Sequence, residues 1–241
     1  MAALCFGKSC FLREVLTPIV TSRASLKYWK KPPNLKDVEL PEHRKLPLLD
    51  KVPPWLAYSK AVKMYKNLID IRGPELIRNK LIYKQYGIIA LSGTNLKHGH
   101  LEMIRNIINK RMDVKRTFAV WGIDSPWKPI TKKSQGKRMG GGKGSIAYYV
   151  TPIRAGRIIV EVGGAVEYEE VYPYLNEIVE KLPCDAMVVS EEIMQELEEE
   201  EQKLVKANIN PFTFESVIKN NLQNCHQWIS KYDKIWFGKY I

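Results

Sequence analysis

Hydrophobic positions recur at helical spacing in two stretches of the chain. They are Leu101, Ile104, Ile108 and Met112, followed by Val171, Leu175, Ile178 and Leu182. Apolar residues three and four positions apart share one face of a helix, so the first set predicts an amphipathic helix over residues 96–112 and the second set predicts another helix. We expect Pro173 to start or kink the second helix and Pro183 to stop it.

Around these stretches the pattern changes to short runs of β-branched and aromatic residues bounded by glycine or proline. The runs cover residues 86–91, 117–123, 146–151, 157–163 and 184–190, and each predicts a β-strand. A tight turn at residues 154–157 should join the third and fourth strands as a hairpin. The order of elements predicts an α+β fold: a mixed or antiparallel sheet with two packed helices and a long glycine-rich basic loop.

Both ends of the chain differ from this central region. Six prolines between residues 31 and 54 predict an extended segment, and helical spacing then returns within residues 55–68. Seven glutamates between residues 191 and 201 predict an acidic helix with a solvated face. Four aromatic residues spaced by four predict one helical stripe, which packs either on the protein's own core or on a neighbouring molecule. They are Trp228, Tyr232, Trp236 and Tyr240.

We therefore divide the chain into four parts. We expect a mitochondrial transit peptide in residues 1–30, a Pro-rich extension with a short helix in 31–79, a core domain in 80–190 and a C-terminal helical extension in 191–241. The first part is poor in acidic residues and carries basic and hydroxyl side chains, as mitochondrial targeting segments do. The predicted location is therefore the mitochondrial matrix. The alternative to a transit peptide is an ordinary basic tail that binds RNA.

The net charge of the 241-residue chain is +12 at pH 7, but it is unevenly distributed. Residues 85–160 carry fourteen basic and three acidic side chains, whereas residues 161–201 carry one basic and fourteen acidic ones. A strongly positive segment favours a polyanionic partner, and nucleic acid is the leading class. A solvated helix face that happens to collect Lys and Arg is the alternative.

The most informative segment is a loop at residues 130–144. Glycine occupies four of its last five positions: Gly140, Gly141, Gly142 and Gly144. Five cations surround these glycines: Lys132, Lys133, Lys137, Arg138 and Lys143. Glycine removes side chains where a backbone must approach something closely or take a positive φ. Bare backbone among cations makes phosphate the natural ligand of this loop.

The loop does not match the nucleotide-binding motifs of enzymes. A Walker A motif anchored on Gly142 and Lys143 would need glycine at Lys137 and a hydroxyl at Gly144. A dinucleotide-binding fingerprint would need a third glycine where Ser145 stands, inside a βαβ unit. These mismatches argue against an NTPase or a dehydrogenase.

Other catalytic and metal-binding patterns are equally weak. The four cysteines are too far apart for a zinc ribbon, and His98 and His100 have no cysteine or acidic ligand pattern nearby. Glu161 and Glu167 are expected on a solvated acidic rim rather than as a catalytic pair. No apolar run is long enough to span a membrane. We therefore expect no enzymatic activity, no metal and no cofactor.

The central region resembles the universal large-subunit ribosomal proteins of the L-sixteen family, in a mitochondrial version. The resemblance covers residues 80–190. It rests on Tyr86-Gly87, the helix with Glu102 and Arg105, Lys128-Pro129-Ile130-Thr131, Lys137-Arg138-Met139-Gly140, Gly142-Lys143-Gly144, Gly156-Arg157 and Lys181-Leu182-Pro183. The Arg-Met-Gly loop, the Gly-Arg turn and the Lys-Leu-Pro helix end form a specific combination.

The resemblance implies a non-catalytic protein that binds rRNA near the base of the central protuberance of the large subunit. Its loop would reach toward the aminoacyl-tRNA and peptidyl-transferase region, and the protein would support subunit assembly. Three features depart from the family pattern. Gly141 replaces a usual lysine, the N-terminal basic arm is absent, and the residues after Ser190 have no bacterial counterpart. Such extensions are typical of mitochondrial ribosomal proteins, which use them against protein neighbours or remodelled rRNA.

The sequence therefore predicts a mitochondrial ribosomal protein whose partners are large-subunit rRNA, tRNA near the aminoacyl site and neighbouring mitochondrial ribosomal proteins, the last through the C-terminal aromatic residues. A non-ribosomal mitochondrial RNA-binding or ribosome-assembly factor is the alternative. The expected RNA-binding residues are Lys97, Arg105, Lys110, Arg111, Lys115, Arg116, Lys132, Lys133, Lys137, Arg138, Gly140, Gly141, Gly142, Lys143, Gly144, Arg154 and Arg157.

Overall fold

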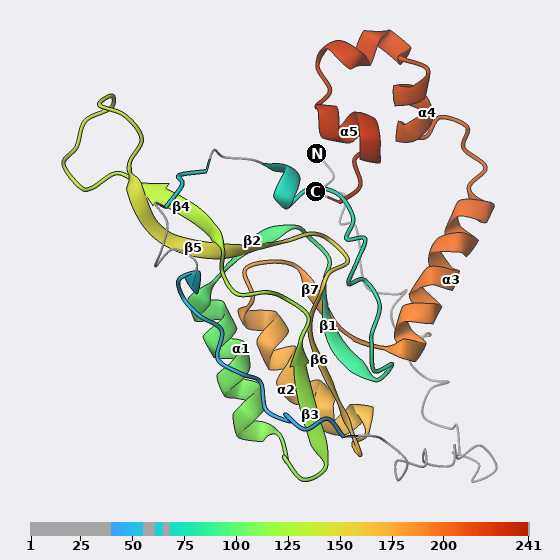
Figure 1. Ribbon diagram of the computed structural model, residues 1–241. Helices are drawn as coiled ribbons and strands as arrows, with labels where there is room; N and C mark the ends of the chain where they lie inside the picture. Colours follow the sequence, from blue (N-terminus) through green and yellow to red (C-terminus); the bar gives the residue numbers. More distant parts are fainter. Residues whose placement is uncertain (1–39, 55–60, 65–67, 241) are drawn as a thin grey trace, which may run out of the picture. The chain divides into compact units, whose positions relative to one another are not determined.

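A four-stranded antiparallel sheet forms the centre of the protein (Figure 1). The computed structural model describes residues 40–54, 61–64 and 68–240. The order of strands in this sheet is β3-β6-β1-β7. Their bounds are Tyr86–Ala90 for β1, Thr117–Trp121 for β3, Ile158–Gly164 for β6 and Ala186–Ser190 for β7. Every residue of β6 is buried, as expected for an inner strand covered on both faces.

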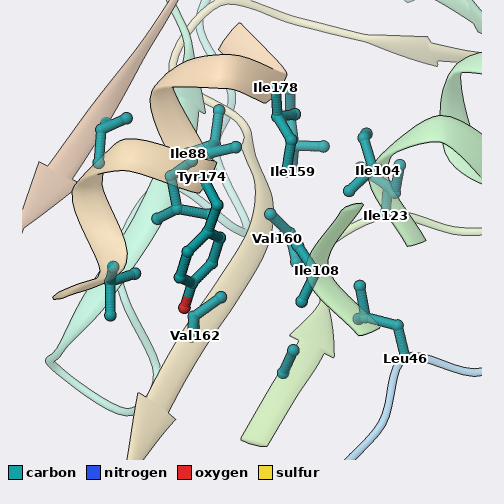
Figure 2. Packing of buried hydrophobic residues seen from close by; sticks show 14 of the residues in the cluster. Leu46, Ile88, Ile104, Ile108, Ile123, Ile159, Val160, Val162, Tyr174 and Ile178 are labelled. Atoms are coloured by element: carbon teal, nitrogen blue, oxygen red, sulfur yellow. The ribbon is translucent and has the colours of Figure 1, made fainter. Parts of the chain in front are cut away.

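Two helices pack on one face of this sheet, α1 (His98–Arg111) and α2 (Tyr168–Lys181). The predicted apolar positions Leu101, Ile104 and Ile108 are buried on α1. On α2, Val171, Leu175 and Ile178 are buried as well. Figure 2 shows side chains of the helices meeting those of β6, among them Ile104, Ile108, Tyr174, Ile178, Val160 and Val162. The helix-period pattern thus identified the core correctly.

The segment before β1 covers the opposite face of the sheet. Val160 and Val162 face the helices, so Glu161 between them points to this second face. Glu161 is only 4% exposed, and its carboxylate accepts hydrogen bonds from the backbone N–H groups of Ile82, at 2.9 and 3.1 Å, and of Tyr83, at 3.1 Å. The expectation that Glu161 lies on a solvated rim is therefore wrong, because the strand register buries it under residues 81–83. Glu167 is exposed.

A second antiparallel sheet contains three strands in the order β2-β5-β4: β2 (Thr94–Lys97), β5 (Ser145–Ile153) and β4 (Lys128–Lys132). The predicted hairpin across residues 154–157 is wrong. The turn is present, with Arg157 N–H donating to Arg154 O at 3.2 Å, but it carries the chain from β5 in one sheet to β6 in the other. The real hairpin joins β4 and β5, and β4 occupies residues that the sequence placed in the long loop.

The predicted boundaries of the second helix also change. Helix α2 begins at Tyr168, so Pro173 lies inside the helix and does not start it. The helix ends at Lys181, before Pro183, as predicted. The Pro-rich segment contributes to the core through Leu46, which is 2% exposed. Asn109 of α1 fixes Leu46 by accepting its N–H at 3.0 Å and donating to its carbonyl at 3.1 Å.

The helix predicted within residues 55–68 is not supported where the chain is described. Residues 61–64 take no regular conformation, and a short 3-10 helix, η4, follows at Leu68–Asp70. The rest of that prediction, and the transit peptide, lie outside the described residues. No helix among the described residues has the length and apolar character that crossing a membrane requires.

Beyond β7 the chain forms α3 (Glu191–Ala207), α4 (Phe214–Lys219), η5 (Leu222–Gln227) and α5 (Lys231–Trp236). Helix α3 has no buried residue, which confirms the predicted solvated face. The predicted continuous aromatic stripe is wrong, because Ser230 caps the start of α5 and Phe237 ends it in a left-handed conformation. Only Tyr232 and Trp236 share this helix, where their rings stack with centroids 6.0 Å apart.

Candidate nucleic-acid interface

The glycine-rich loop is the connection of the β4–β5 hairpin (Figure 1). Lys132 pairs with Ser145 at the end of the strands, and residues 134–143 between them are exposed. Gly144 is required by this close pairing, since a Cβ atom there would lie 2.7 Å from the carbonyl carbon and oxygen of Lys132. The hairpin therefore presents the loop from a fixed base.

The glycines at the tip of the loop serve a different purpose. Gly140, Gly141 and Gly142 have φ values of +93°, +67° and +87°, a region that side-chain-bearing residues rarely adopt. A Cβ atom at any of the three would meet nothing within 4 Å. The protein itself therefore leaves this backbone open, so an external surface can approach it closely.

The cations of the loop fall into two roles. Lys133 donates from Nζ to the carbonyls of Arg138, at 3.4 Å, and Gly140, and so shapes the loop from within. Lys137 and Arg138 are exposed, and Met139 beside them is 99% exposed. Together with Lys63 and Lys143, the loop lines an open hollow of about 520 Å³. This hollow is walled by positive charge and bare backbone.

Lys63 is a site residue that the sequence reasoning missed. Its Nζ donates to the carbonyl of Lys143 at 3.3 Å, and Lys143 Nζ donates to the carbonyls of Lys63, at 3.2 Å, and Met64. Residues 61–64 thus lie against the base of the loop and add a cation to it. The helical spacing around Lys63 suggested a separate helix and gave no signal for this contact.

Lys97 lies on the same sheet as the hairpin. Its Nζ stands 5.3 Å from the centroid of the Tyr148 ring, which belongs to β5. Lys97 also precedes α1, where its N–H donates to His100 Nδ1 at 3.3 Å. Burial, with a smaller effect of the Lys97 charge, lowers the pKa of His100. Lys97 therefore extends the positive surface of the hairpin along the sheet.

Four of the predicted cations lie elsewhere, at the C-terminal end of α1: Lys110, Arg111, Lys115 and Arg116. A helix of 14 residues is about 20 Å long, which separates this cluster from β2 and its sheet. Arg111 pairs with Glu177 at 2.9 Å, and Arg116 pairs with Asp113 at 3.3 Å and Glu170 at 3.8 Å. The basic segment therefore forms two clusters, one at the hairpin and one at the end of α1. Acidic neighbours partly neutralise the cluster at the end of α1.

Arg157 has a structural role. Its side chain is 15% exposed, donates to Glu75 at 3.1 Å and to the Gly122 carbonyl at 3.1 Å, and lies 3.7 Å from Asp124. Arg154 donates to the carbonyl of Ile69 at 3.1 Å. These contacts hold the segment before β1 and the segment after β3 against the sheets, so Arg157 has little capacity left for phosphate.

Arg105 and His98 lie in the protein's own packing. Arg105 is half-buried, and its Nε has no hydrogen-bond partner. His98 Nε2 contacts the carbonyl of Leu49 at 2.9 Å and thereby ties the Pro-rich segment to α1. Within the described ranges, no three His, Cys, Asp or Glu side chains are grouped so that they could hold a metal ion.

Two comparisons with known proteins cover this region. The profile of the family described as ribosomal protein L16p/L10e matches residues 59–189, which is more than half of the chain. A curated relative, the large ribosomal subunit protein uL16 of Agathobacter rectalis, is 37% identical over 112 residues. The aligned part covers 46% of this chain and 75% of the relative. The matched residues include the whole β4–β5 hairpin and exclude α3, α4 and α5.

Proposed function

Because this chain belongs to the ribosomal protein L16p/L10e family, we propose that the β4–β5 hairpin is its principal rRNA-binding element. The protein is a structural component of the large ribosomal subunit and has no enzymatic role. The observation that carries the proposal is the loop tip, where three consecutive glycines with positive φ expose bare backbone between Arg138 and Lys143.

The chemistry of this loop fits packed phosphates. Backbone N–H groups and flanking cations are donors for phosphate oxygens, and the missing side chains let the loop pass between RNA strands that would exclude bulkier residues. Such contacts position RNA without reading its sequence. Each cation that neutralises a phosphate releases counterions, so affinity should fall steeply as salt rises.

The proposed interface contains the cations that the structure gathers at the hairpin: Lys63, Lys97, Lys132, Lys133, Lys137, Arg138 and Lys143. The cluster at the end of α1 is a second, weaker contact, because Glu170 and Glu177 compete there with phosphate. We leave Arg105 and Arg157 out, since one is half-buried and the other is held by carboxylates.

A finer placement is part of the proposal. The loop would face the aminoacyl-tRNA and peptidyl-transferase region near the base of the central protuberance, as the family resemblance implies. The acid-poor N-terminal residues favour a mitochondrial ribosome in the matrix. Among the C-terminal aromatic residues, Trp228 is 73% exposed and is the best placed to meet a protein neighbour. The ring of Trp236 packs over Gly73 instead.

Density-gradient fractionation of mitochondrial lysate tests this proposal. The protein should sediment with the large subunit and stay there after a wash in moderate salt. A protein found only in light fractions would refute the ribosomal role, and one that leaves the subunit in moderate salt would be an assembly factor instead. N-terminal sequencing of the protein from the heavy fractions tests import, since a matrix protein should have lost roughly its first 30 residues.

A further inference from the structure

Helix α3 carries an apolar stripe that is exposed to solvent from Leu197 onward. Helical positions turn by about 100° per residue, which places five apolar residues within one third of the circumference: Ile193, Met194, Leu197, Leu204 and Val205. Leu197, Leu204 and Val205 are 42%, 72% and 67% exposed. The whole 17-residue helix has no buried residue. A helix of this kind normally gains its stability by packing its apolar face.

Glutamates border this stripe along its length. The same helical geometry puts Glu196 and Glu200 along one edge and Glu191 and Glu198 along the other. Glu201 lies inside the stripe and pairs with Lys239 at 3.1 Å, while Glu199 on the far side of the helix pairs with Lys203 at 3.5 Å. The glutamates at the two edges form no ion pair within the part of the chain that the structure describes.

We propose that α3 is a docking site for a Lys- and Arg-rich amphipathic segment of another protein. The partner's apolar residues would cover the α3 stripe, and its cations would pair with the bordering glutamates. Repulsion between the closely spaced glutamates destabilises the isolated helix, and a basic partner would remove that repulsion. The inference does not depend on the RNA-binding hairpin. The hairpin belongs to the three-stranded sheet, whereas α3 follows β7 of the four-stranded sheet.

The charge of α3 argues against the other occupants. Its seven glutamates outnumber its two lysines, so RNA phosphates and anionic lipid headgroups would be repelled. A second copy of this chain would bring the same face against itself in a two-fold dimer and oppose glutamates to glutamates. Cationic protein is the chemistry that this face complements.

A binding measurement on the full chain tests the proposal. The probe is a fluorescein-labelled amphipathic helical peptide made of leucine and lysine, and its affinity is followed by fluorescence anisotropy at low and moderate salt. Leu204→Ser with Val205→Ser should weaken binding about tenfold or more. Glu196→Gln, Glu198→Gln and Glu200→Gln together should weaken binding at low salt and flatten its salt dependence. Gln195→Ser, on the opposite face, is the matched control.

Several outcomes would overturn the proposal. A peptide with serine in place of leucine must bind much more weakly, because equal binding would mean charge attraction alone. The proposal also fails if Leu204→Ser with Val205→Ser changes the affinity for an RNA oligonucleotide or converts a dimer into a monomer by sedimentation. Circular dichroism checks that each variant keeps its helices.

A second measurement identifies the partner in cells. Benzoyl-phenylalanine placed at position 204 of the full chain should crosslink to a protein segment rich in Lys and Arg, whereas the same probe at position 195 should not. The triple glutamine variant should lose that crosslink. Crosslinks to RNA or to a second copy, equal crosslinks at both positions, or no crosslink at position 204 would each refute the proposal.

Discussion

Lys63 and Lys143, 80 positions apart, hold each other's main chains at the base of the β4–β5 loop. Lys63 Nζ donates to the carbonyl of Lys143 at 3.3 Å, and Lys143 Nζ donates to the carbonyl of Lys63 at 3.2 Å. Each lysine thereby fixes the other's segment beside Gly142 and Gly144, at the end of the glycine run. Both side chains add positive charge to the hollow that the loop lines, and this charge favours an anion such as an RNA phosphate there.

The first prediction concerns RNA affinity. Arg138→Ala with Lys143→Ala should weaken binding of the full chain to its rRNA and lower the slope of log affinity against log salt by roughly one unit per cation. The thermal midpoint should change little, because both residues are exposed and the contacts that Lys143 makes to the Lys63 and Met64 carbonyls lie at the surface. Filter binding across a salt series measures the slope. Lys110→Ala with Arg111→Ala, at the far end of α1, is the control and should have a smaller effect. An unfolded double variant would show that the loop is structural.

The second prediction separates two kinds of glycine in the loop. Gly141→Ala forces a methyl group into a left-handed conformation and should cost about 1 kcal/mol, with the hairpin intact. Gly144→Ala should open the hairpin, since its Cβ would lie 2.7 Å from the Lys132 carbonyl. Hydrogen exchange of residues 128–132 and 145–153 should therefore rise only in Gly144→Ala. Equal protection in the two variants would contradict this assignment.

The third prediction concerns a largely buried ion pair. Lys128 Nζ lies 2.5 Å from Asp70 Oδ2, and the Lys128 side chain is 7% exposed. Asp70→Ala removes the carboxylate beside a Lys128 side chain that is largely buried, so it should lower the free energy of unfolding by about 3 kcal/mol. Asp70→Leu combined with Lys128→Met should recover most of that loss. Urea denaturation of Asp70→Leu, Lys128→Met and the double variant gives the coupling energy, and additive losses would mean that the two groups do not interact.

The fourth prediction concerns pH. Burial raises the pKa of Glu161, although the backbone N–H groups of Ile82 and Tyr83 oppose the shift. A carboxyl whose folded-state pKa is raised contributes stability that is complete below its unfolded value, near 4.5, and is lost as pH rises through the folded value. Glu161→Gln does not titrate. The parent protein should therefore gain stability relative to this variant as pH falls through that window.

Thermal unfolding of both proteins from neutral pH to pH 4 measures this difference. Asp113 serves for comparison. Its pKa is lowered chiefly by the backbone N–H of Lys115, so its contribution is present above the unfolded value and disappears as pH falls through the folded value. If the parent protein instead loses stability relative to Glu161→Gln on acidification, the backbone N–H groups outweigh burial in setting the pKa of Glu161.

The sequence by itself determined several local features of this protein. Apolar spacing located α1 and α2 and their buried residues, because a helix that faces a core repeats that spacing. The glycine run predicted either a close approach of the backbone or positive φ values at the loop tip, and Gly140, Gly141 and Gly142 have positive φ. The failed nucleotide motifs and the family resemblance correctly excluded an enzyme. The helix and glycine inferences need only residues that are close in the chain.

Only the tertiary structure decided which strands pair. The turn at residues 154–157 looked like a hairpin, yet β5 and β6 enter different sheets, because strand pairing depends on partners far away in the sequence. The same long-range pairing buried Glu161, engaged Arg157 with Glu75, and divided the basic segment into two clusters. It also brought Lys63 to the loop. Charge along the chain identified the partner class, whereas packing decided which cations can reach it.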